Sequence, residues 1–408
     1  MLDRRTWRQF DWLLLVAVIG LLIIGVVMIY SATQRDPVIR NLWLDQAFTA
    51  VGAVFVLLLL AAFDYALLRN LTPLLYAITL SMLVLVLVIG QESFGARRWF
   101  RLPGFDLQPG EVSKVLLTIV LARFVADREG RRPYFETILL SGLLVLPCVG
   151  LIMLQPNLST AMTIIFLWIA VIFVGGLARE HVTILGGAAV ALLLAFLVIA
   201  RLPSETLPTN DQAAAESASL STPAAPGTPA GAPTPAPPAE GLIRSYQLRR
   251  IENLLFGGQQ GENYQSDQAL IALGSGGMLG KGLLKGTQTQ YGYFPVRHTD
   301  FIFSVIGEEL GFVGTSICLL LLFTVILRAL WAAYRARDSF GRLLCVGVAA
   351  VLFLQTYINI GMQVGWAPVT GVVLPFISYG RTNLIVVMIA VGIVESVVLR
   401  HRRTPLAI

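Results

Sequence analysis

Apolar runs of membrane-spanning length recur along almost the whole of this 408-residue sequence. Most of these runs have a length close to that of a helix that crosses a bilayer, about 20 residues. Charged residues make up only 13% of the chain, and the mean hydropathy is +0.74. Soluble domains carry about 25% charged residues, so the sequence predicts an all-α polytopic membrane protein with one large loop.

Ten transmembrane helices are predicted. The apolar runs lie at about residues 13–30, 43–63, 71–90, 111–126, 136–154, 159–175, 182–200, 301–328, 343–363 and 371–399. The run 111–126 is short and carries Glu111, Ser113 and Lys114 in its first turn. Both termini are basic, so the positive-inside rule places both in the cytoplasm and requires an even number of spans. Counting 111–126 as a span meets that requirement.

These runs divide the chain into three predicted regions. Residues 1–200 hold helices 1–7, and residues 201–299 form a large extracellular loop between helices 7 and 8. Residues 300–408 hold helices 8–10 and a basic cytoplasmic tail. No tandem repeat is evident.

The large loop has two parts. Residues 203–240 are rich in Pro and Ala, and we expect a disordered spacer there. Residues 242–299 are expected to be ordered, since amphipathic periodicity at 242–256 and 264–273 predicts two short helices at the membrane surface.

The formal net charge of +6 comes from basic residues spread through short loops between apolar runs. That distribution indicates topology signals and contacts with anionic membrane lipid, not a nucleic-acid partner. The three cysteines lie inside apolar runs, and the three histidines are far apart in sequence. No metal-ligand pattern is present, so no protein metal site is predicted.

The most informative stretch runs from Phe294 to Gly311, where a polar loop meets an apolar run. Asp300, Ser304 and Glu308 are spaced by four residues, so on a helix they share one face. An acidic stripe is costly in lipid and should line a cavity, which marks Asp300 as a candidate catalytic or ion-coupling group. The alternative is that Asp300 only caps the helix N-terminus.

Two further charged groups have a functional and a structural interpretation. Glu111 can orient Lys114 toward an anionic substrate group, or the two can form an ion pair that neutralises its own insertion cost. The loop 91–110 carries Arg98 and Arg101 beside aromatic residues. These arginines suit a phosphate or pyrophosphate, or anchor the loop at the membrane interface.

Two glycine- and proline-containing stretches complete the candidates. The stretch 274–286 resembles a phosphate loop only weakly, but it can bring Lys281 and Lys285 near an anionic lipid headgroup. In 366–383, glycine and proline interrupt the helical pattern before the last span. Irregular backbone at membrane depth is tolerated at a cavity, so a cavity wall is predicted there.

Together these stretches resemble the SEDS family (shape, elongation, division and sporulation), the RodA and FtsW proteins of bacterial cell-wall synthesis. The matching motifs are DWLLL…MIYSAT, FGARRWF with LQPGEVSK, GSGGMLGKGLLKGTQTQ, HTDFIFSVIGEELGFVG and PVTGVVLPFISYG, which span residues 11 to 380. PVTG and the GIVESV ending are more like RodA than FtsW. The resemblance implies a glycosyltransferase of the bacterial cytoplasmic membrane that polymerises lipid II for cell-wall elongation and shape. Its partner would be a class B penicillin-binding protein.

The resemblance places the family's essential aspartate on Asp300. Its QPSE-x-x-K pattern falls on Gln108, Pro109, Glu111 and Lys114, with Gly110 where serine is usual. The final motif reads YGRTN in place of YGGSS: Arg381 adds a positive charge, Thr382 keeps a hydroxyl and Asn383 does not.

On this basis Asp300 is the expected general base for the acceptor sugar hydroxyl. Lys114, Arg98, Arg101 or a divalent cation (Mg²⁺ or Mn²⁺) would neutralise the leaving pyrophosphate. Glu111 would orient Lys114 and Glu308 would support the cavity. The remaining candidates for substrate binding are Gln108, Lys281, Lys285 and Ser378.

Two other functions fit a polytopic protein with acidic residues. A lipid II flippase would use membrane carboxylates for proton coupling, but it needs charge along its whole path. Here the charges outside the loops gather toward the outer half. A scaffold that only holds the penicillin-binding protein would tolerate loss of Asp300.

Overall fold

The computed structural model describes residues 9–93, 96–102, 105–130, 134–155, 157–176, 264–293, 296–367 and 369–400. All of them belong to one compact unit, formed by Met1–Leu177 and Arg249–Ile408. The predicted span 182–200, the predicted spacer 203–240 and the predicted surface helix 242–256 lie outside the described residues.

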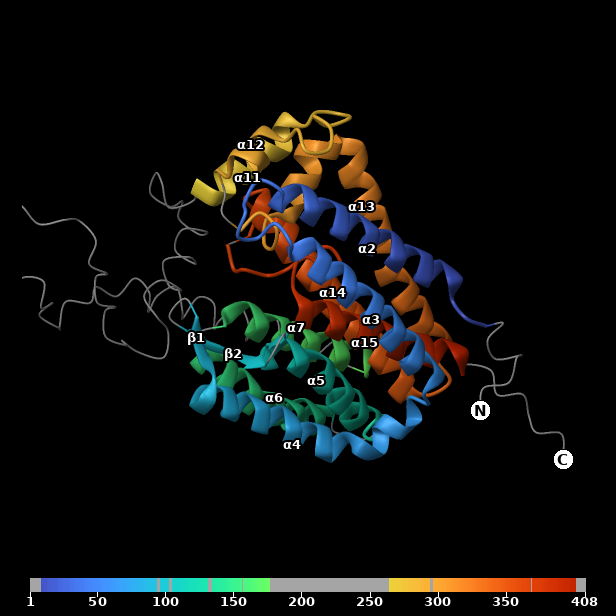
Figure 1. Cartoon of the computed structure of the whole chain (residues 1–408). Helices are drawn as coiled ribbons and strands as arrows, with labels where there is room; N and C mark the ends of the chain where they lie inside the picture. The colour runs from blue at the N-terminus through green and yellow to red at the C-terminus, as the bar shows by residue number, and fades with distance from the viewer. Residues whose placement is uncertain are drawn as a thin grey trace, which may run out of the picture. The chain divides into compact units, whose positions relative to one another are not determined.

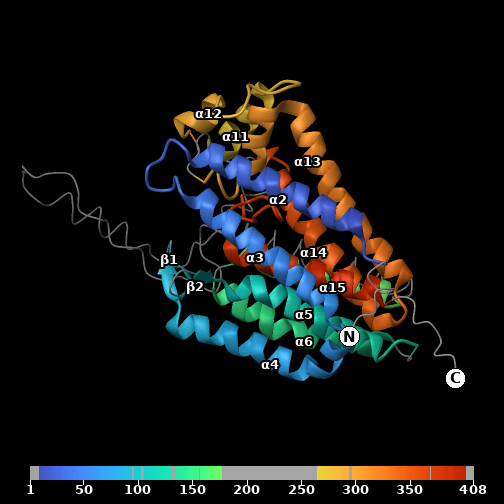
Figure 2. The ribbon, with the colours of Figure 1, turned by 45° about the vertical axis from the view of Figure 1, so that its right-hand side comes forward.

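Helices make up most of this unit (Figures 1 and 2). The longer ones are α2 (Trp12–Thr33), α3 (Leu42–Ala62), α4 (Ala66–Ile89), α5 (Pro109–Ala126), α6 (Tyr134–Leu154), α7 (Leu158–Val174), α13 (Ile302–Arg335), α14 (Ser339–Gln363) and α15 (Arg381–Leu399). Two shorter helices, α11 (Tyr264–Ser275) and α12 (Thr287–Tyr291), precede α13. The helix predicted at 264–273 is thus present as α11, while its place at the membrane surface stays a prediction.

Within the described residues, seven helices are long and apolar enough to cross a membrane. They are α2, α3, α4, α6, α13, α14 and α15. The shorter α7 is also apolar, and the predicted run 111–126 is helical as α5. The prediction of an all-α, multi-pass membrane protein is therefore confirmed.

The last predicted span, 371–399, is wrong over its first ten residues. Helix α15 begins only at Arg381, and the preceding segment from Val369 to Gly380 is irregular. Gly371 and Phe376 both have positive φ, 72° and 67°, a region that L-residues rarely adopt. Side chains from other elements bind this segment's carbonyls, in place of a helical ladder.

A small sheet also lies where only a loop was expected. Strands β1 (Gln91–Ser93), β2 (Ala96–Leu102) and β3 (Phe105–Leu107) pair antiparallel in the order β1-β2-β3. The central run ARRWFRL contains aromatic residues, which favour strands. This sheet leads directly into α5 and so fixes where that helix begins.

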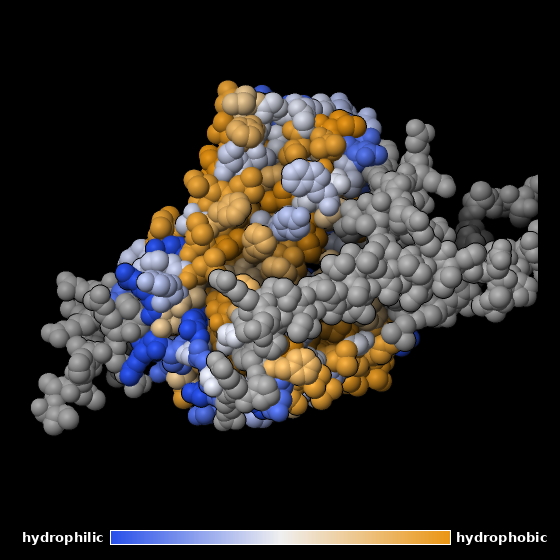
Figure 3. Space-filling view, turned by 180° about the vertical axis from the view of Figure 1, so that it is seen from behind, coloured by the Kyte–Doolittle hydropathy of each residue, from blue (hydrophilic) through white to orange (hydrophobic). Residues whose placement is uncertain are grey.

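Helix α15 forms the centre of the bundle. In its most apolar window 89% of residues are buried, against 22% for α4, and it packs against α3, α5, α13 and α14. Apolar side chains cover much of the outer face in Figure 3, in orange. Phe48, Phe55 and Leu143 are among the large apolar side chains that are mostly exposed. A broad apolar surface suits contact with lipid tails.

A buried polar cluster joins three helices at one end of the bundle. Arg328 of α13 pairs with Asp11, the N-cap of α2, at 2.5 Å. Asp11 N donates to Glu395 Oε1 of α15 over 2.6 Å, and both carboxylates are almost fully buried. Arg328 is therefore the cation that compensates two buried acids.

Replacing Arg328 with alanine should lower stability by about 2–4 kcal/mol, because it leaves buried carboxylates without their cation. The measurement is the thermal unfolding midpoint of the purified protein in detergent. Arg337→Ala, which removes a basic side chain at the turn after α13, serves as the control. Equal midpoints for the two variants would contradict this assignment.

Candidate functional site

The turn that carries Asp300 is fixed through its backbone carbonyls. Residues 296–301 form the turn before α13, in which Asp300 N donates to Val296 O over 3.1 Å. Three successive carbonyls then accept hydrogen bonds from outside the turn: His298 O from Tyr379 N (2.9 Å), Thr299 O from Ser378 Oγ (2.6 Å), and Asp300 O from Asn359 Nδ2 (2.9 Å). The irregular segment before α15 and the end of α14 thus hold this turn from two sides.

A stripe of three buried amides on α14 leads away from the turn. Gln355, Asn359 and Gln363 recur every four residues, so they share one helix face, and none is more than 1% exposed. Gln363 Nε2 donates to Asp300 O over 3.2 Å, and Gln363 Oε1 accepts from the backbone and hydroxyl of Ser304. The predicted site residues omit this stripe. Amides at helical spacing inside an apolar run are its sequence signal.

Asp300 itself is half-buried at the mouth of the bundle. A Cβ placed on Gly371 would lie 3.5 Å from Asp300 Oδ2, so the carboxylate rests against the irregular segment. Arg297 is buried beside it and donates from Nε to Ala32 O at the end of α2 over 2.6 Å. Asp300 therefore sits at a junction of α2, α13, α14 and the segment before α15.

His298, two residues before Asp300, is held neutral. Burial and, to a smaller extent, nearby Arg297 lower the pKa of its imidazole from 6.5 to about 4, although Asp36 opposes the shift. Its Nδ1 is buried with no hydrogen-bond partner within the described residues. Protonation of this ring would therefore place a second positive charge near Arg297 within the turn.

On acidification from pH 7 to pH 5, His298 should contribute a loss of about 2 kcal/mol in the free energy of unfolding. In that range the unfolded state takes up the proton at the ordinary pKa of 6.5 and the folded state does not. Lowered carboxyl pKa values, as at Asp127 and Glu129, add losses only below about pH 4.5. The measurement is the unfolding midpoint at both pH values. His298→Gln should lack this part of the shift, and an unchanged shift would refute the assignment.

Glu308 lies in a different environment from Asp300. It is fully buried and pairs with Lys281 Nζ at 2.8 Å. Its oxygens also accept from the hydroxyls of Thr287 and Thr289 and from the backbone N–H groups of Gln288 and Thr289. Glu308 therefore anchors the N-terminus of α12, and Asp300, Ser304 and Glu308 do not line one open cavity as the sequence suggested.

The segment Gly276–Gly286, here called the glycine-rich loop, packs tightly on the first turns of α13. A Cβ on Gly276 would lie 1.9 Å from Gly307 O. Phe312 N donates to Gly277 O over 2.8 Å, where Gly311 interrupts α13 with φ 68°. Of the two predicted lysines, Lys281 is engaged by Glu308, whereas Lys285 is exposed.

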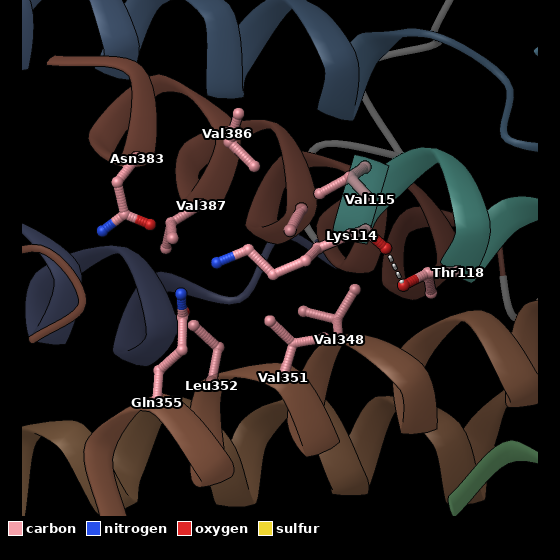
Figure 4. Close-up of a pocket in the computed structure, with 11 residues that line it drawn as sticks. Lys114, Val115, Thr118, Val348, Val351, Leu352, Gln355, Asn383, Val386 and Val387 are labelled. Carbon is pink, nitrogen blue, oxygen red and sulfur yellow. Dashed lines mark hydrogen bonds between the residues drawn. The ribbon is translucent and has the colours of Figure 1, made fainter. Parts of the chain in front are cut away.

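Glu111 and Lys114 come together as predicted, at 2.7 Å within the first turns of α5. Lys114 is almost fully buried and points into a cavity of about 10 Å³ (Figure 4). Gln355 and Asn383 line the same cavity, and each has a buried amide oxygen without a partner among the described side chains. A cavity of about 10–15 Å³ holds a single water molecule, so a pyrophosphate does not fit beside Lys114 in this conformation.

The other candidates are spread around the sheet and α5. Strand alternation places Arg98 and Arg101 on opposite faces of β2: Arg98 Nε donates to Gln155 O over 2.8 Å, while Arg101 is exposed. Gln108 stands at the N-cap of α5 and its carbonyl accepts from Glu111 N. Ser378 lies in the irregular segment before α15 and donates to Thr299 O of the Asp300 turn.

The loop after α2 borders an open groove that the sequence did not indicate. Its volume is about 400 Å³, and it is lined by Tyr30, Gln34, Pro37, Arg40, Asn41 and Trp43. It lies close to the end of α2 that Arg297 contacts. Ligand pockets commonly measure about 300–1,000 Å³, so this groove has room for a sugar-sized group.

Comparison with known proteins agrees with this architecture. The family model for FtsW/RodA/SpoVE cell cycle proteins matches residues 11–207 and 238–403. The peptidoglycan glycosyltransferase MrdB of Escherichia coli K12 is 33% identical, covering 95% of this chain and 93% of its own. The probable peptidoglycan glycosyltransferase FtsW of Trichlorobacter lovleyi is 32% identical, covering 98% and 95%.

Two solved structures are similar over nearly the whole chain. One, described as structural coordination of polymerization and crosslinking by a peptidoglycan synthase complex, has a TM-score of 0.74 at 31% identity and covers 97% of this chain and 99% of its own. The rod shape determining protein RodA of Thermus thermophilus has a TM-score of 0.65 at 28% identity, with 98% and 99% covered. Since the family model also matches most of the sequence, this chain belongs to the FtsW/RodA/SpoVE family of cell cycle proteins.

Proposed function

We propose that this protein is a peptidoglycan glycosyltransferase that polymerises lipid II into glycan strands at the outer face of the bacterial cytoplasmic membrane. The observation that carries the proposal is the Asp300 turn, in which one half-buried carboxylate stands on a backbone held by three external hydrogen bonds. The relatives of this chain, MrdB and FtsW, are named as a peptidoglycan glycosyltransferase and a probable one. A fixed carboxylate at a membrane mouth suits a general base for glycosyl transfer.

In the proposed reaction Asp300 accepts the proton of the acceptor sugar hydroxyl as that oxygen attacks the donor's anomeric carbon. The bond from this carbon to the undecaprenyl pyrophosphate breaks, and the pyrophosphate leaves with the electron pair. Arg101 is exposed and can meet that negative charge directly. Lys114 can do so only after α5, α14 and α15 separate around its small cavity.

A divalent cation, Mg²⁺ or Mn²⁺, is also proposed to assist the leaving group. The described residues contain no group of three or more His, Cys, Asp or Glu side chains that could hold a metal ion. Mg²⁺ commonly binds through one or two carboxylates together with substrate phosphates. Because Asp300 is the proposed base, the substrate phosphates would supply most of the ligands, and the ion would neutralise charge on the pyrophosphate.

The proposed topology has ten spans with both termini in the cytoplasm. Helices α5 and α7 and the predicted run 182–200 bring the seven long spans to ten. Asp11 contacts Arg328 at one end of α13, and Ser31 contacts Glu309 near the other. Asp300 therefore stands at the end opposite Arg328, and the basic residues that follow Arg328, Arg335 and Arg337, favour the cytoplasmic side. The proposed partner is a class B penicillin-binding protein, which would cross-link the strands.

The deciding experiment is an assay of purified protein with labelled lipid II while the partner's transpeptidase is blocked. Glycan strands on a gel are the expected product. The rival function, a lipid II flippase, predicts instead that labelled lipid II crosses the bilayer of reconstituted vesicles and that no strands form.

A further inference from the structure

We propose that Asn359 is a positioning residue that fixes the backbone of Asp300 for catalysis, an inference that rests on the function proposed above. Asn359 lies on α14, 59 residues away from Asp300 in sequence, and is fully buried. Asn359 does not touch the reacting atoms itself, but it holds the backbone of Asp300, the residue that would touch them.

The side chain of Asn359 joins two separate segments of the site. Its Nδ2 donates to Asp300 O over 2.9 Å and to Val372 O over 2.7 Å. Its Oδ1 accepts from Gln363 Nε2 over 2.8 Å. An asparagine amide has two N–H donors, so both donors and the oxygen are used and the orientation of the amide is fixed.

Both segments contribute to the position of the Asp300 carboxylate. The first is the turn that carries it. The second is the irregular segment in which Gly371, next to Val372, lies against Asp300 Oδ2. One amide thus sets the distance between the carboxylate's own backbone and the surface on which the carboxylate rests.

This arrangement matters because proton transfer depends on geometry. A base must come within hydrogen-bond reach of the acceptor hydroxyl, and a misplacement of about 1 Å can lower a rate about 100-fold. Gln363 also donates to Asp300 O, at 3.2 Å, but it has no such bond to Val372. Loss of Asn359 therefore releases the irregular segment at Val372, while the bonds of Ser378 and Tyr379 to the turn remain.

The test compares Asn359→Leu and Asn359→Ser with Thr356→Val. Leucine keeps the branched shape of asparagine without its donors but is bulkier, whereas serine is smaller and cannot overpack the site, so a folding failure of one variant leaves the other. Thr356 is buried on the same helix, and its hydroxyl has no hydrogen-bond partner within the described residues, which makes valine a matched control. Rates are measured with labelled lipid II and expressed per folded molecule.

The expected result is a fall in kcat of about 10–100-fold for both Asn359 variants, with KM for lipid II within about twofold of the Thr356→Val value. A purely structural role would lower the amount of folded protein but leave kcat per folded molecule unchanged, and that outcome overturns the proposal. So does a raised KM at unchanged kcat, which would make Asn359 a binding residue.

Asp300→Asn, measured in the same series, distinguishes a failure of the base role of Asp300 from a failure of the positioning role of Asn359. If this variant polymerises at the wild-type rate, the base assignment fails and the positioning role fails with it. If it is inactive while both Asn359 variants match Thr356→Val, the base assignment stands and only the positioning role is refuted.

Discussion

Asp300→Asn is expected to lower the rate of glycan-strand formation about 100- to 10,000-fold, because loss of a general base removes a contribution of that size. Asparagine has the shape of aspartate, and the turn is held by backbone carbonyls that the substitution leaves in place. The fold and lipid II binding should therefore persist. The measurement is strand formation from labelled lipid II, together with binding of lipid II to the same preparation.

Asp267→Asn is the matched control for this variant. Asp267 is an exposed carboxylate on α11, outside the turn, so its loss should leave the rate within about twofold of wild type. Full activity of Asp300→Asn in folded protein would show that another group takes the proton.

Replacing Glu308 with leucine is expected to have the largest effect on stability, a loss of about 3–5 kcal/mol. The change removes the acceptor of Lys281 and of the first backbone N–H groups of α12, all in a buried place. The glycine-rich loop should then detach from α13. Two measurements check this: the thermal unfolding midpoint in detergent, and the rate of proteolytic cleavage between Gly276 and Gly286.

Lys285→Ala provides the comparison on the same loop. Lys285 is exposed, and exposed substitutions of this kind change stability by less than about 0.5 kcal/mol. If Glu308→Leu and Lys285→Ala unfold at the same temperature and are cleaved equally fast, Glu308 does not anchor the loop.

The sequence predicted the helices well where hydrophobicity alone decides them. The long apolar runs at 13–30, 43–63 and 136–154 appear as α2, α3 and α6 with nearly the predicted bounds. Hydropathy failed at 371–380, because apolar residues there adopt positive φ and bond to side chains of other elements. Such long-range bonds leave no periodic trace in a single sequence.

In the candidate site, too, contacts between residues close in sequence were predicted and contacts between distant residues were not. The pair Glu111 and Lys114 follows from local helical spacing and is present. In contrast, spacing also suggested a shared role for Asp300 and Glu308, and the structure gives them different neighbours. The missing information was the position of the glycine-rich loop, which packs over Glu308. Asn359 was missed because its partners, Asp300 and Val372, are distant in sequence.

The length of α13 has a consequence for access to the chemistry. Its 34 residues would extend about 51 Å at 1.5 Å per residue, whereas the hydrocarbon core of a bilayer is about 30 Å thick. The interruption at Gly311 separates a first part of about 15 Å, capped by the glycine-rich loop, from a second part long enough to cross the core. Asp300 then stands above the acyl chains, at the level of the lipid headgroups. On the proposed topology, which places the Asp300 end outside the cell, a polar, water-borne inhibitor would reach it without entering the hydrocarbon.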